Sequence, residues 1–184
     1  MTISWKLLKR TVLVQTKFMT VFQDTVELPS GETQEYFMTK KPDITLVVAT
    51  TSEGKIVLVD EYQYAAGKSL LMVPAGHRPQ GEDAVTTARR ELMEETGYGG
   101  GEVVKSVRLY ESPVRDLHQV DVIQLKNVVS MAQPVHESTE FITIRLVDRE
   151  DIQKLLLNGD LESCSTLGAL AVCGIFCVPD KKKI

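Results

Sequence analysis

The feature that most constrains this chain is a segment that reads as a helix and ends in three acidic residues, Glu91, Glu94 and Glu95. Gly81, Glu82 and Asp83 can open the helix, because either acid suits the positive end of the helix dipole. Gly97 is the usual left-handed residue after a last turn. Glutamates three or four residues apart repel one another by roughly 0.2–0.5 kcal/mol per pair, and the negative end of a helix disfavours acids by a similar amount. The segment therefore predicts a helix whose last turn needs a positive partner.

The apolar side of this helix indicates where the acids lie. Val85, Ala88 and Leu92 follow the i, i+3, i+7 spacing of a buried stripe. Glu91 and Glu95 project beside that stripe, at the margin of the core, where desolvation makes an unpaired carboxylate costly. Mg²⁺ resolves this conflict, because it binds carboxylate oxygens, keeps several waters and is usually completed by substrate phosphates. The alternative is a solvated acidic helix end that neighbouring arginines and lysines balance.

A longer pattern around the helix distinguishes these two interpretations. The segment from Gly76 to Tyr98 resembles the Nudix box, G-x5-E-x7-R-E-U-x-E-E-x-G-U, in which U is hydrophobic. The fixed positions of the box are filled by Gly76, Glu82, Arg90, Glu91, Glu94, Glu95 and Gly97. Leu92 fills the first hydrophobic position, and Tyr98 fills the second, where an aliphatic residue is usual. The resemblance implies a Nudix-type α/β/α sandwich with a mixed sheet.

In the Nudix family the box forms a loop–helix–loop that holds Mg²⁺ or Mn²⁺ against a diphosphate. The metal ligands that the resemblance implies are Glu91 and Glu95, assisted by Glu94, Glu82 and the carbonyl of Ala75. Arg90 is implied to orient the glutamates by ion pairing. The catalytic residues are thus implied to include Arg90 and the three glutamates that follow it.

Outside the box the chain is similar to ADP-ribose pyrophosphatases and related nucleoside diphosphate sugar hydrolases over most of its length. The substrate-binding residues that this implies are Tyr62, Gln63, Ala75, Gly76 and Pro113. Each of three motifs of that subgroup is altered in this chain, and Q-Y-R reads Glu61-Tyr62-Gln63 here. Gln63 replaces the arginine of Q-Y-R, Met72 replaces the glutamate of E-L-P-A-G, and Val114 replaces the glycine of S-P-G.

The resemblance implies an enzyme that hydrolyses the pyrophosphate bond of a nucleotide sugar. ADP-ribose is the first candidate substrate, with AMP and ribose 5-phosphate as products. The departures keep open a different nucleotide sugar, such as GDP-mannose. A nucleotide-binding module without turnover is a further interpretation, and the complete set of glutamates counts against it.

An acidic loop before a late strand often supplies the general base, or a further metal ligand, in this family. Here the loop spans residues 133–141 and offers Glu137 and Glu140, of which Glu140 aligns better with the family acid. Surface glutamates without a catalytic role are an equal interpretation for both. Weaker candidates are Arg115, Asp116, His118 and His136, since a lone histidine is more often a satisfied or surface residue than a catalyst.

The rest of the chain divides into two predicted parts. Residues 1–42 are rich in β-branched and aromatic residues and predict an N-terminal β region, which the resemblance implies is exchanged between the subunits of a homodimer. Residues 43–184 interleave strands with three helices and predict the Nudix domain as a mixed α/β structure. The two later helices are expected at residues 148–159 and 163–176.

Composition limits the partners and the compartment. A net charge of −4 argues against broad nucleic-acid binding, which needs a basic face. The longest apolar segment, residues 167–178, is too short to span a bilayer, and no signal peptide is evident. The cysteines Cys164, Cys173 and Cys177 are interpreted as buried thiols of a reducing compartment, the last two one turn apart on the final helix. We therefore expect a cytoplasmic protein without a membrane or nucleic-acid partner.

Overall fold

The structure is a computed structural model of the 184-residue chain, and it describes residues 4–136 and 141–176. Two compact units divide the chain. The first is formed by the residues up to Asp43 and by Tyr110–Val120, and the second by Ile44–Leu109 and the residues from Asp121 onward. The sequence places a boundary at residues 42–43, but it gives no signal that Tyr110–Val120 belongs to the first unit.

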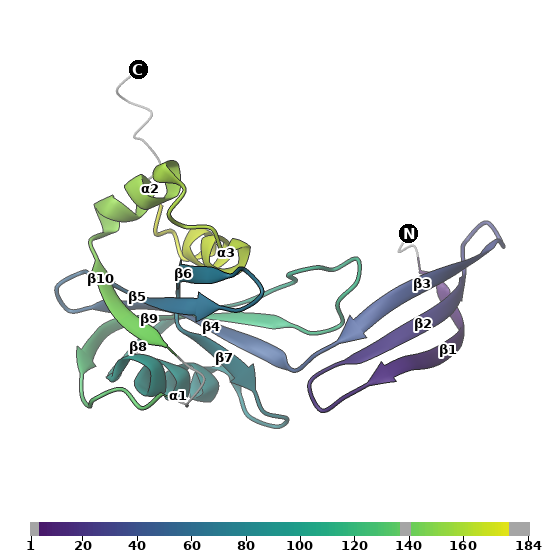
Figure 1. Cartoon of the computed structure of the whole chain (residues 1–184), viewed down its shortest axis with the longest axis horizontal. Helices are drawn as coiled ribbons and strands as arrows, with labels where there is room; N and C mark the ends of the chain where they lie inside the picture. The colour runs from purple at the N-terminus through teal and green to yellow at the C-terminus, as the bar shows by residue number, and fades with distance from the viewer. Residues whose placement is uncertain (1–3, 137–140, 177–184) are drawn as a thin grey trace, which may run out of the picture. The chain divides into compact units, whose positions relative to one another are not determined.

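The first unit contains an antiparallel sheet with the strand order β1-β2-β3 (Figure 1). Its strands are β1 (Lys6–Gln15), β2 (Thr20–Glu27) and β3 (Thr33–Lys40). Asp24 of β2 is buried, and its carboxylate accepts two hydrogen bonds from Arg10 of β1 at 2.7 and 2.6 Å. Arg10 and Asp24 are also direct partners in the strand register. This paired charge therefore supports the alignment of β1 on β2.

The second unit is built around a seven-stranded sheet. The strand order is β10-β5-β4-β9-β8, with β6 paired to β5 and β7 paired to β4. The strands are β4 (Asp43–Thr51), β5 (Ile56–Gln63), β6 (Lys68–Met72), β7 (Ala75–Arg78), β8 (Tyr98–Leu109), β9 (Val120–Ser130) and β10 (Ile142–Val147). β4 and β5 form the hairpin that the polar turn between them predicts, and Gly54 takes the left-handed position in that turn.

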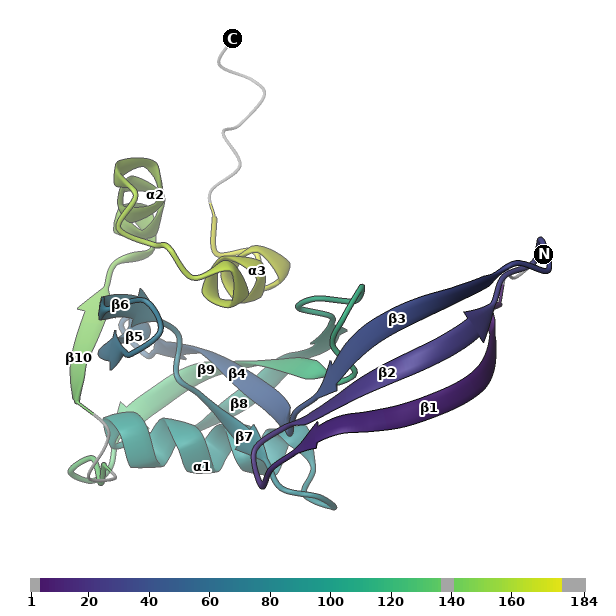
Figure 2. The same ribbon diagram turned by 45° about the vertical axis from the view of Figure 1, so that its right-hand side comes forward.

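The helices within residues 4–136 and 141–176 lie on the two faces of this sheet (Figures 1 and 2). They are α1 (Ala84–Thr96), α2 (Arg149–Asn158) and α3 (Cys164–Val172). In both views α1 lies on one face of the sheet and α3 on the opposite face. The layered α/β fold with an N-terminal β region, expected from the sequence, is confirmed. None of the helices in the described part of the chain is long and apolar enough to cross a membrane.

The core between α1 and the sheet fixes the orientation of the helix. Ala88 and Leu92 are fully buried, and Val85 packs against the same cluster. The strand residues of this cluster are Val47, Ala49, Val57, Ile123, Leu125 and Val128. The apolar stripe predicted from the sequence therefore faces the sheet. Because the stripe is buried, Glu91 and Glu95 lie at the edge of the core, as the helical spacing predicts.

The last helix is shorter than the sequence predicts. It ends at Val172, with Cys173 as its C-terminal cap, and Gly174 follows with a left-handed φ of 65°. Cys173 therefore does not lie within the helix one turn before Cys177, and Cys177 is outside the described residues. Cys164 is exposed, so the interpretation of the cysteines as buried thiols is wrong for this residue.

Candidate active site

Helix α1 is capped at both ends, and the caps fix the position of its acidic last turn. Asp83 accepts hydrogen bonds from the N–H groups of Val85 and Thr86, both at 3.0 Å. Gly97 ends the helix with a φ of 69°. A Cβ at residue 97 would overlap the carbonyl of Ala132, so both the backbone conformation and the available space require glycine here.

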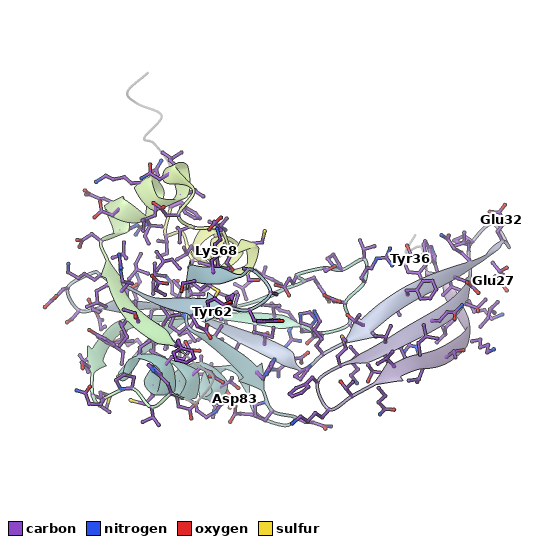
Figure 3. The ribbon with its side chains drawn as sticks, viewed as in Figure 1. Glu27, Glu32, Tyr36, Tyr62, Lys68 and Asp83 are labelled. Atoms are coloured by element: carbon purple, nitrogen blue, oxygen red, sulfur yellow. The ribbon has the colours of Figure 1, made fainter. Side chains whose placement is uncertain are left out.

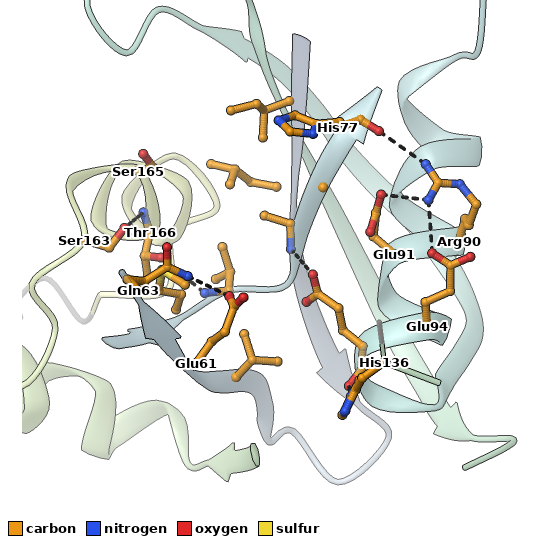
Figure 4. Close-up of a pocket in the computed structure, with 18 of the residues that line it drawn as sticks. Glu61, Gln63, His77, Arg90, Glu91, Glu94, His136, Ser163, Ser165 and Thr166 are labelled. Carbon is orange, nitrogen blue, oxygen red and sulfur yellow. Dashed lines mark hydrogen bonds and ion pairs between the residues drawn. The ribbon is translucent and has the colours of Figure 1, made fainter. Parts of the chain in front are cut away.

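Arg90 connects the acidic residues of this region (Figure 4). Its Nη1 donates to Glu91 Oε1 at 2.8 Å and to Glu94 Oε2 at 3.1 Å. Its Nη2 donates to Glu82 Oε2 and to the carbonyl of His77, each at 3.3 Å. A single guanidinium thus reduces the repulsion among three carboxylates and links both ends of α1 to β7.

The charged forms of these groups are stabilised by one another. Burial alone would lower the pKa of Arg90, but the charge of Glu91 and hydrogen bonds to Glu82, Glu91 and Glu94 raise it above its ordinary value. The pKa of Glu82 is lowered, first by a hydrogen bond from the Thr87 hydroxyl at 2.6 Å and then by Arg90. The Glu82 carboxylate and the Arg90 guanidinium therefore both stay ionised at neutral pH.

Glu95 and Glu91 lie against the chain segment that precedes the helix. Glu95 is only 7% exposed, and its Oε1 accepts a hydrogen bond from the N–H of Ala75 at 3.4 Å. The resemblance implies a role for the carbonyl of Ala75, whereas this contact is made by its N–H. A Cβ at residue 76 would overlap the carboxylate of Glu91, so Gly76 is needed for this close approach.

These residues line one end of a cavity of about 860 Å³ in the second unit. At the other end lie Glu61 and Gln63 of β5 and Ser163 and Ser165 at the start of α3 (Figure 4). The amide Nε2 of Gln63 donates to Glu61 Oε2 at 2.8 Å. Apolar side chains, including those of Ile44, Leu46, Val59 and Val73, also line the cavity. The cavity thus joins an acidic end to a polar end across an apolar surface.

The predicted substrate-binding residues fall into two groups. Gln63, Ala75 and Gly76 line the cavity. Tyr62, labelled in Figure 3, is half exposed and does not line it, because successive residues of a strand point to opposite sides. Pro113 belongs to the first unit, whereas the residues that line this cavity belong to the second.

The sequence did not predict that Glu61, Ser163 and Ser165 line the cavity. Glu61 shares a side of β5 with Gln63, so the two-residue period of a strand would have found it once Gln63 was placed. Ser163 caps α3, where its hydroxyl accepts from the N–H of Thr166 at 3.3 Å. Ser165 follows it in the first turn. No local pattern indicates that the start of this helix reaches the same cavity as the box glutamates.

The segment after β9 contacts the end of α1. The N–H of Val135 donates to a carbonyl of the last turn at 2.8 Å, and His136 Nε2 lies 2.8 Å from the carbonyl oxygen of Glu95. Both residues line the cavity. The predicted general bases Glu137 and Glu140 lie outside the described residues, so their roles stay predictions.

The donor groups at the acidic end fit a hard divalent cation, because they are carboxylate oxygens. The carboxylates concerned are those of Glu82, Glu91, Glu94 and Glu95. Arg90 is the guanidinium that three of them share. Arg89 does not balance them, because it donates to the carbonyls of Gly100 and Gly101 at 2.6 and 3.1 Å. The alternative interpretation is that neighbouring arginines neutralise the helix end. Of the two arginines, only Arg90 does so.

A second group of possible ligands lies in the first unit. Among the residues that the structure describes, Glu111, Asp116 and His118 have ligand atoms within 4.8 Å of one another. His118 is buried, and its Nε2 lies 3.2 Å from Glu111 Oε2. The Thr39 hydroxyl donates to Asp116, and Lys41 Nζ lies 3.5 Å from Asp116 Oδ2. These two contacts lower the pKa of Asp116, so its negative charge is already compensated within the fold.

Comparison with known families agrees with this fold. Residues 40–164 match the NUDIX domain, and residues 5–38 match the nucleoside diphosphate sugar hydrolase N-terminal domain. The chain therefore belongs to the Nudix family. Within that family it is a pyrophosphohydrolase of the ADP-ribose pyrophosphatase type.

Individual relatives extend this comparison. The chain is 30% identical to the ADP-ribose pyrophosphatase of Bacillus subtilis over 156 residues, which cover 84% of each protein. It is 27% identical to a CMP-5'-(N-acetyl-N-hydroxy-3-aminopropyl)phosphonate hydrolase of Streptomyces rubellomurinus, over 89% of this chain and 80% of that protein. A shorter match, 47% over 75 residues, covers 41% of this chain and 40% of a methanol dehydrogenase activator of Bacillus methanolicus. The crystal structure of an ADP compounds hydrolase has the same fold, with a TM-score of 0.82, 18% identity and 95% of both chains covered.

Proposed function

We propose that this protein hydrolyses the pyrophosphate bond of a nucleoside diphosphate sugar with the help of Mg²⁺, or Mn²⁺ in its place. The proposed substrate is ADP-ribose, which with one water gives AMP and ribose 5-phosphate. The observation that carries the proposal is the set of carboxylates around Arg90 at one end of a cavity of about 860 Å³. Cavities of this size typically hold one small-molecule ligand.

The residues of the acidic end have two proposed roles, which are binding of the cation and positioning of its ligands. Glu91 and Glu95 are the proposed principal ligands of the cation, with Glu94, Glu82 and the carbonyl of Ala75 in support. A bound divalent cation would supply a Lewis acid that offsets negative charge on the phosphoryl oxygens. Arg90 holds the carboxylates in place, because it contacts three of them within 3.3 Å.

Hydrolysis also needs an acceptor for the proton that water loses when it attacks phosphorus. Glu140 remains the predicted acceptor, with Glu137 as the alternative. Both follow His136, which contacts the carbonyl of Glu95 at the edge of the cavity. Their position in the sequence supports this assignment.

A different nucleotide sugar, such as GDP-mannose, is the second candidate substrate. Gln63 and Met72 favour it, because both line the cavity and both depart from the motifs of the ADP-ribose pyrophosphatase subgroup. The 30% identity to the Bacillus subtilis ADP-ribose pyrophosphatase, over most of both chains, favours ADP-ribose.

A substrate panel tests the proposed function. Purified protein would be incubated with ADP-ribose, GDP-mannose, UDP-glucose and ATP, each with Mg²⁺ and with Mn²⁺, and the products would be separated by chromatography. We expect the highest kcat/KM for ADP-ribose, with equal amounts of AMP and ribose 5-phosphate. Preferred turnover of GDP-mannose would support the second candidate. Absence of cleavage across the whole panel would refute the proposed function.

We also propose that the protein is a homodimer joined through its N-terminal sheet. β1 is an edge strand of that sheet. Its exposed apolar residues are Leu7, Leu8, Val12, Leu13 and Val14. An apolar edge strand favours association with another chain. The match of residues 5–38 to the N-terminal domain of nucleoside diphosphate sugar hydrolases supports a dedicated role for this region.

A further inference from the structure

We propose that the polar end of the cavity selects an uncharged, hydroxyl-bearing group, and that Glu61 is the specificity-determining residue there. The proposal rests on the proposed function and deepens it, because it states which part of a nucleotide sugar this end accepts. The polar end is also proposed to reject a ligand that carries a further phosphate. Gln63 is assigned the role of a positioning residue for Glu61.

The charge of the cavity lining is the first support. The carboxylates among its described residues are Glu61, Glu91, Glu94 and Glu95. Arg90 is the only described lining residue with a permanent positive charge. Its guanidinium donates four hydrogen bonds, all to groups at the acidic end of the cavity. A ligand phosphate therefore depends on a cation at the acidic end, and a phosphate at the opposite end would meet the like charge of Glu61.

The position of Glu61 in the sheet is the second support. Its backbone is paired with Leu70 of β6 on one side and with Ile142 of β10 on the other. The amide of Gln63 donates to its carboxylate at 2.8 Å. Because β5 lies between two partner strands at this point, the carboxylate is held by the rigid part of the fold. An ionised carboxylate accepts several hydrogen bonds, so the bond from Gln63 is compatible with a further one from a ligand hydroxyl.

The other polar groups at this end match the same ligand chemistry. Ser163 and Ser165 line the cavity near Glu61 and Gln63 (Figure 4). Hydroxyl, amide and carboxylate groups together donate to and accept from sugar hydroxyls. Met72 adds an apolar surface rather than a cation. The sugar part of a nucleotide sugar fits this set, whereas a terminal phosphate does not.

The test compares ADP-ribose with two analogues that carry one more phosphate, ADP-ribose 1″-phosphate and 2′-phospho-ADP-ribose. The first carries the phosphate on the terminal ribose and the second on the adenosine ribose. 2′-Phospho-ADP-ribose carries its added charge on the other half of the substrate and is the comparison. Because the terminal ribose is the part proposed to lie at Glu61, the analogue that brings its charge to this residue is ADP-ribose 1″-phosphate. We expect the wild-type protein to use that analogue about 100-fold less efficiently than ADP-ribose, measured as kcat/KM, because of like-charge repulsion.

Glu61→Gln keeps the size of the side chain and removes its charge. We expect the discrimination against the phosphorylated analogue to fall by about tenfold, and kcat/KM for ADP-ribose to fall by about tenfold through KM, because a hydrogen bond to a charged acceptor is weakened. Gln63→Leu is expected to change both quantities in the same direction and to a smaller extent. Asp60→Asn is the matched control, since it removes one charge from the other side of the same strand.

Two results would overturn the inference. One is equal use of ADP-ribose and ADP-ribose 1″-phosphate by the wild-type protein. The other is an unchanged discrimination ratio in Glu61→Gln, with thermal melting showing that the variant is folded. If Glu61→Gln does not fold, the discrimination ratio is measured for Gln63→Leu instead. An unchanged ratio in that variant would then overturn the inference. A wild-type protein that cleaves no nucleotide sugar would instead refute the proposed function, so the two failures are distinguishable.

Discussion

Single residues set the geometry of the acidic end, and Gly76 and Arg90 show this most clearly. Gly76 leaves the space in which the Glu91 carboxylate lies. Arg90 contacts Glu82, Glu91 and Glu94 within 3.3 Å. The box pattern identified both residues, and the resemblance implied that Arg90 pairs with the glutamates, but nothing in the sequence indicated what lies against Gly76. A glycine has no side chain, so the reason for a glycine at a given position becomes clear only when its neighbour in space is known.

Gly76→Ala is expected to disturb the site through Glu91. The added Cβ overlaps the Glu91 carboxylate, so this side chain must move. A displacement of about 1 Å can cost about 100-fold in rate, and we expect a loss of this size in kcat/KM for ADP-ribose. Gly168→Ala is the control, because its added Cβ would lie 3.8 Å from Leu109, an ordinary contact. Full activity in Gly76→Ala would contradict the role of this glycine.

The cysteines give a prediction that depends on pH. Burial raises the pKa of the Cys173 thiol to about 11. At pH 8 only about one Cys173 in a thousand is therefore a reactive thiolate. Cys164 is exposed. We expect iodoacetamide to modify Cys164 well before Cys173 at pH 8, and the rate at Cys173 to rise as the pH approaches 11, as measured by peptide mass spectrometry. Equal rates at pH 8 would contradict the partial burial of Cys173.

At the scale of secondary-structure elements, α1 is the element that the sequence predicts best. Its caps, its apolar stripe and the spacing of its acids all agree, and each is a local pattern. α3 was predicted too long, because an apolar run does not mark where a helix stops, while Gly174 does. β7 was not predicted. Its four residues, Ala75–Arg78, are too few to show a period.

The packing of α1 gives a prediction for stability. Leu92 is fully buried between the helix and the sheet. Leu92→Ala is expected to lower the free energy of unfolding by about 2–5 kcal/mol, because it leaves a cavity in the core. Leu157→Ala on α2 is the matched control, since Leu157 is 77% exposed, and its effect is expected to stay within about 0.5 kcal/mol. Denaturant unfolding measures both, and equal effects would contradict the position of α1.

At the scale of the whole molecule, the cavity is the feature that local patterns do not reveal. It is lined by residues of β5, β6, α1 and α3, which are far apart in the sequence. Residues 110–120 likewise belong to the first unit although they follow β8 of the second. Both features depend on which strands pair with one another. The hydrophobic periodicity of a single sequence does not determine this pairing. Ser163 and Ser165 were missed for that reason, whereas the two-residue period of β5 was enough to indicate Glu61.

The proposed homodimer gives a prediction for the assembly. Val12 lies on the edge strand β1 and is 51% exposed. A lysine there places charge on an edge strand, which opposes pairing with another chain. We expect the wild-type protein to have twice the monomer mass by light scattering, and Val12→Lys to shift toward the monomer. Leu157→Lys, in the second unit, is the control and is expected to remain dimeric. A monomeric wild-type protein would refute the homodimer.

The central claim is that the glutamates at the end of α1 hold a divalent cation with which a diphosphate is cleaved. Its most direct test is the rate of ADP-ribose hydrolysis across a Mg²⁺ titration, measured for the wild-type protein and for Glu95→Gln, with the exposed Glu102→Gln as control. We expect Glu95→Gln to lose about 100-fold or more in kcat/KM. Mg²⁺ should raise the Tm of the wild-type protein and change that of Glu95→Gln much less. Equal Mg²⁺-dependent activity in Glu95→Gln and the wild-type protein would contradict the account.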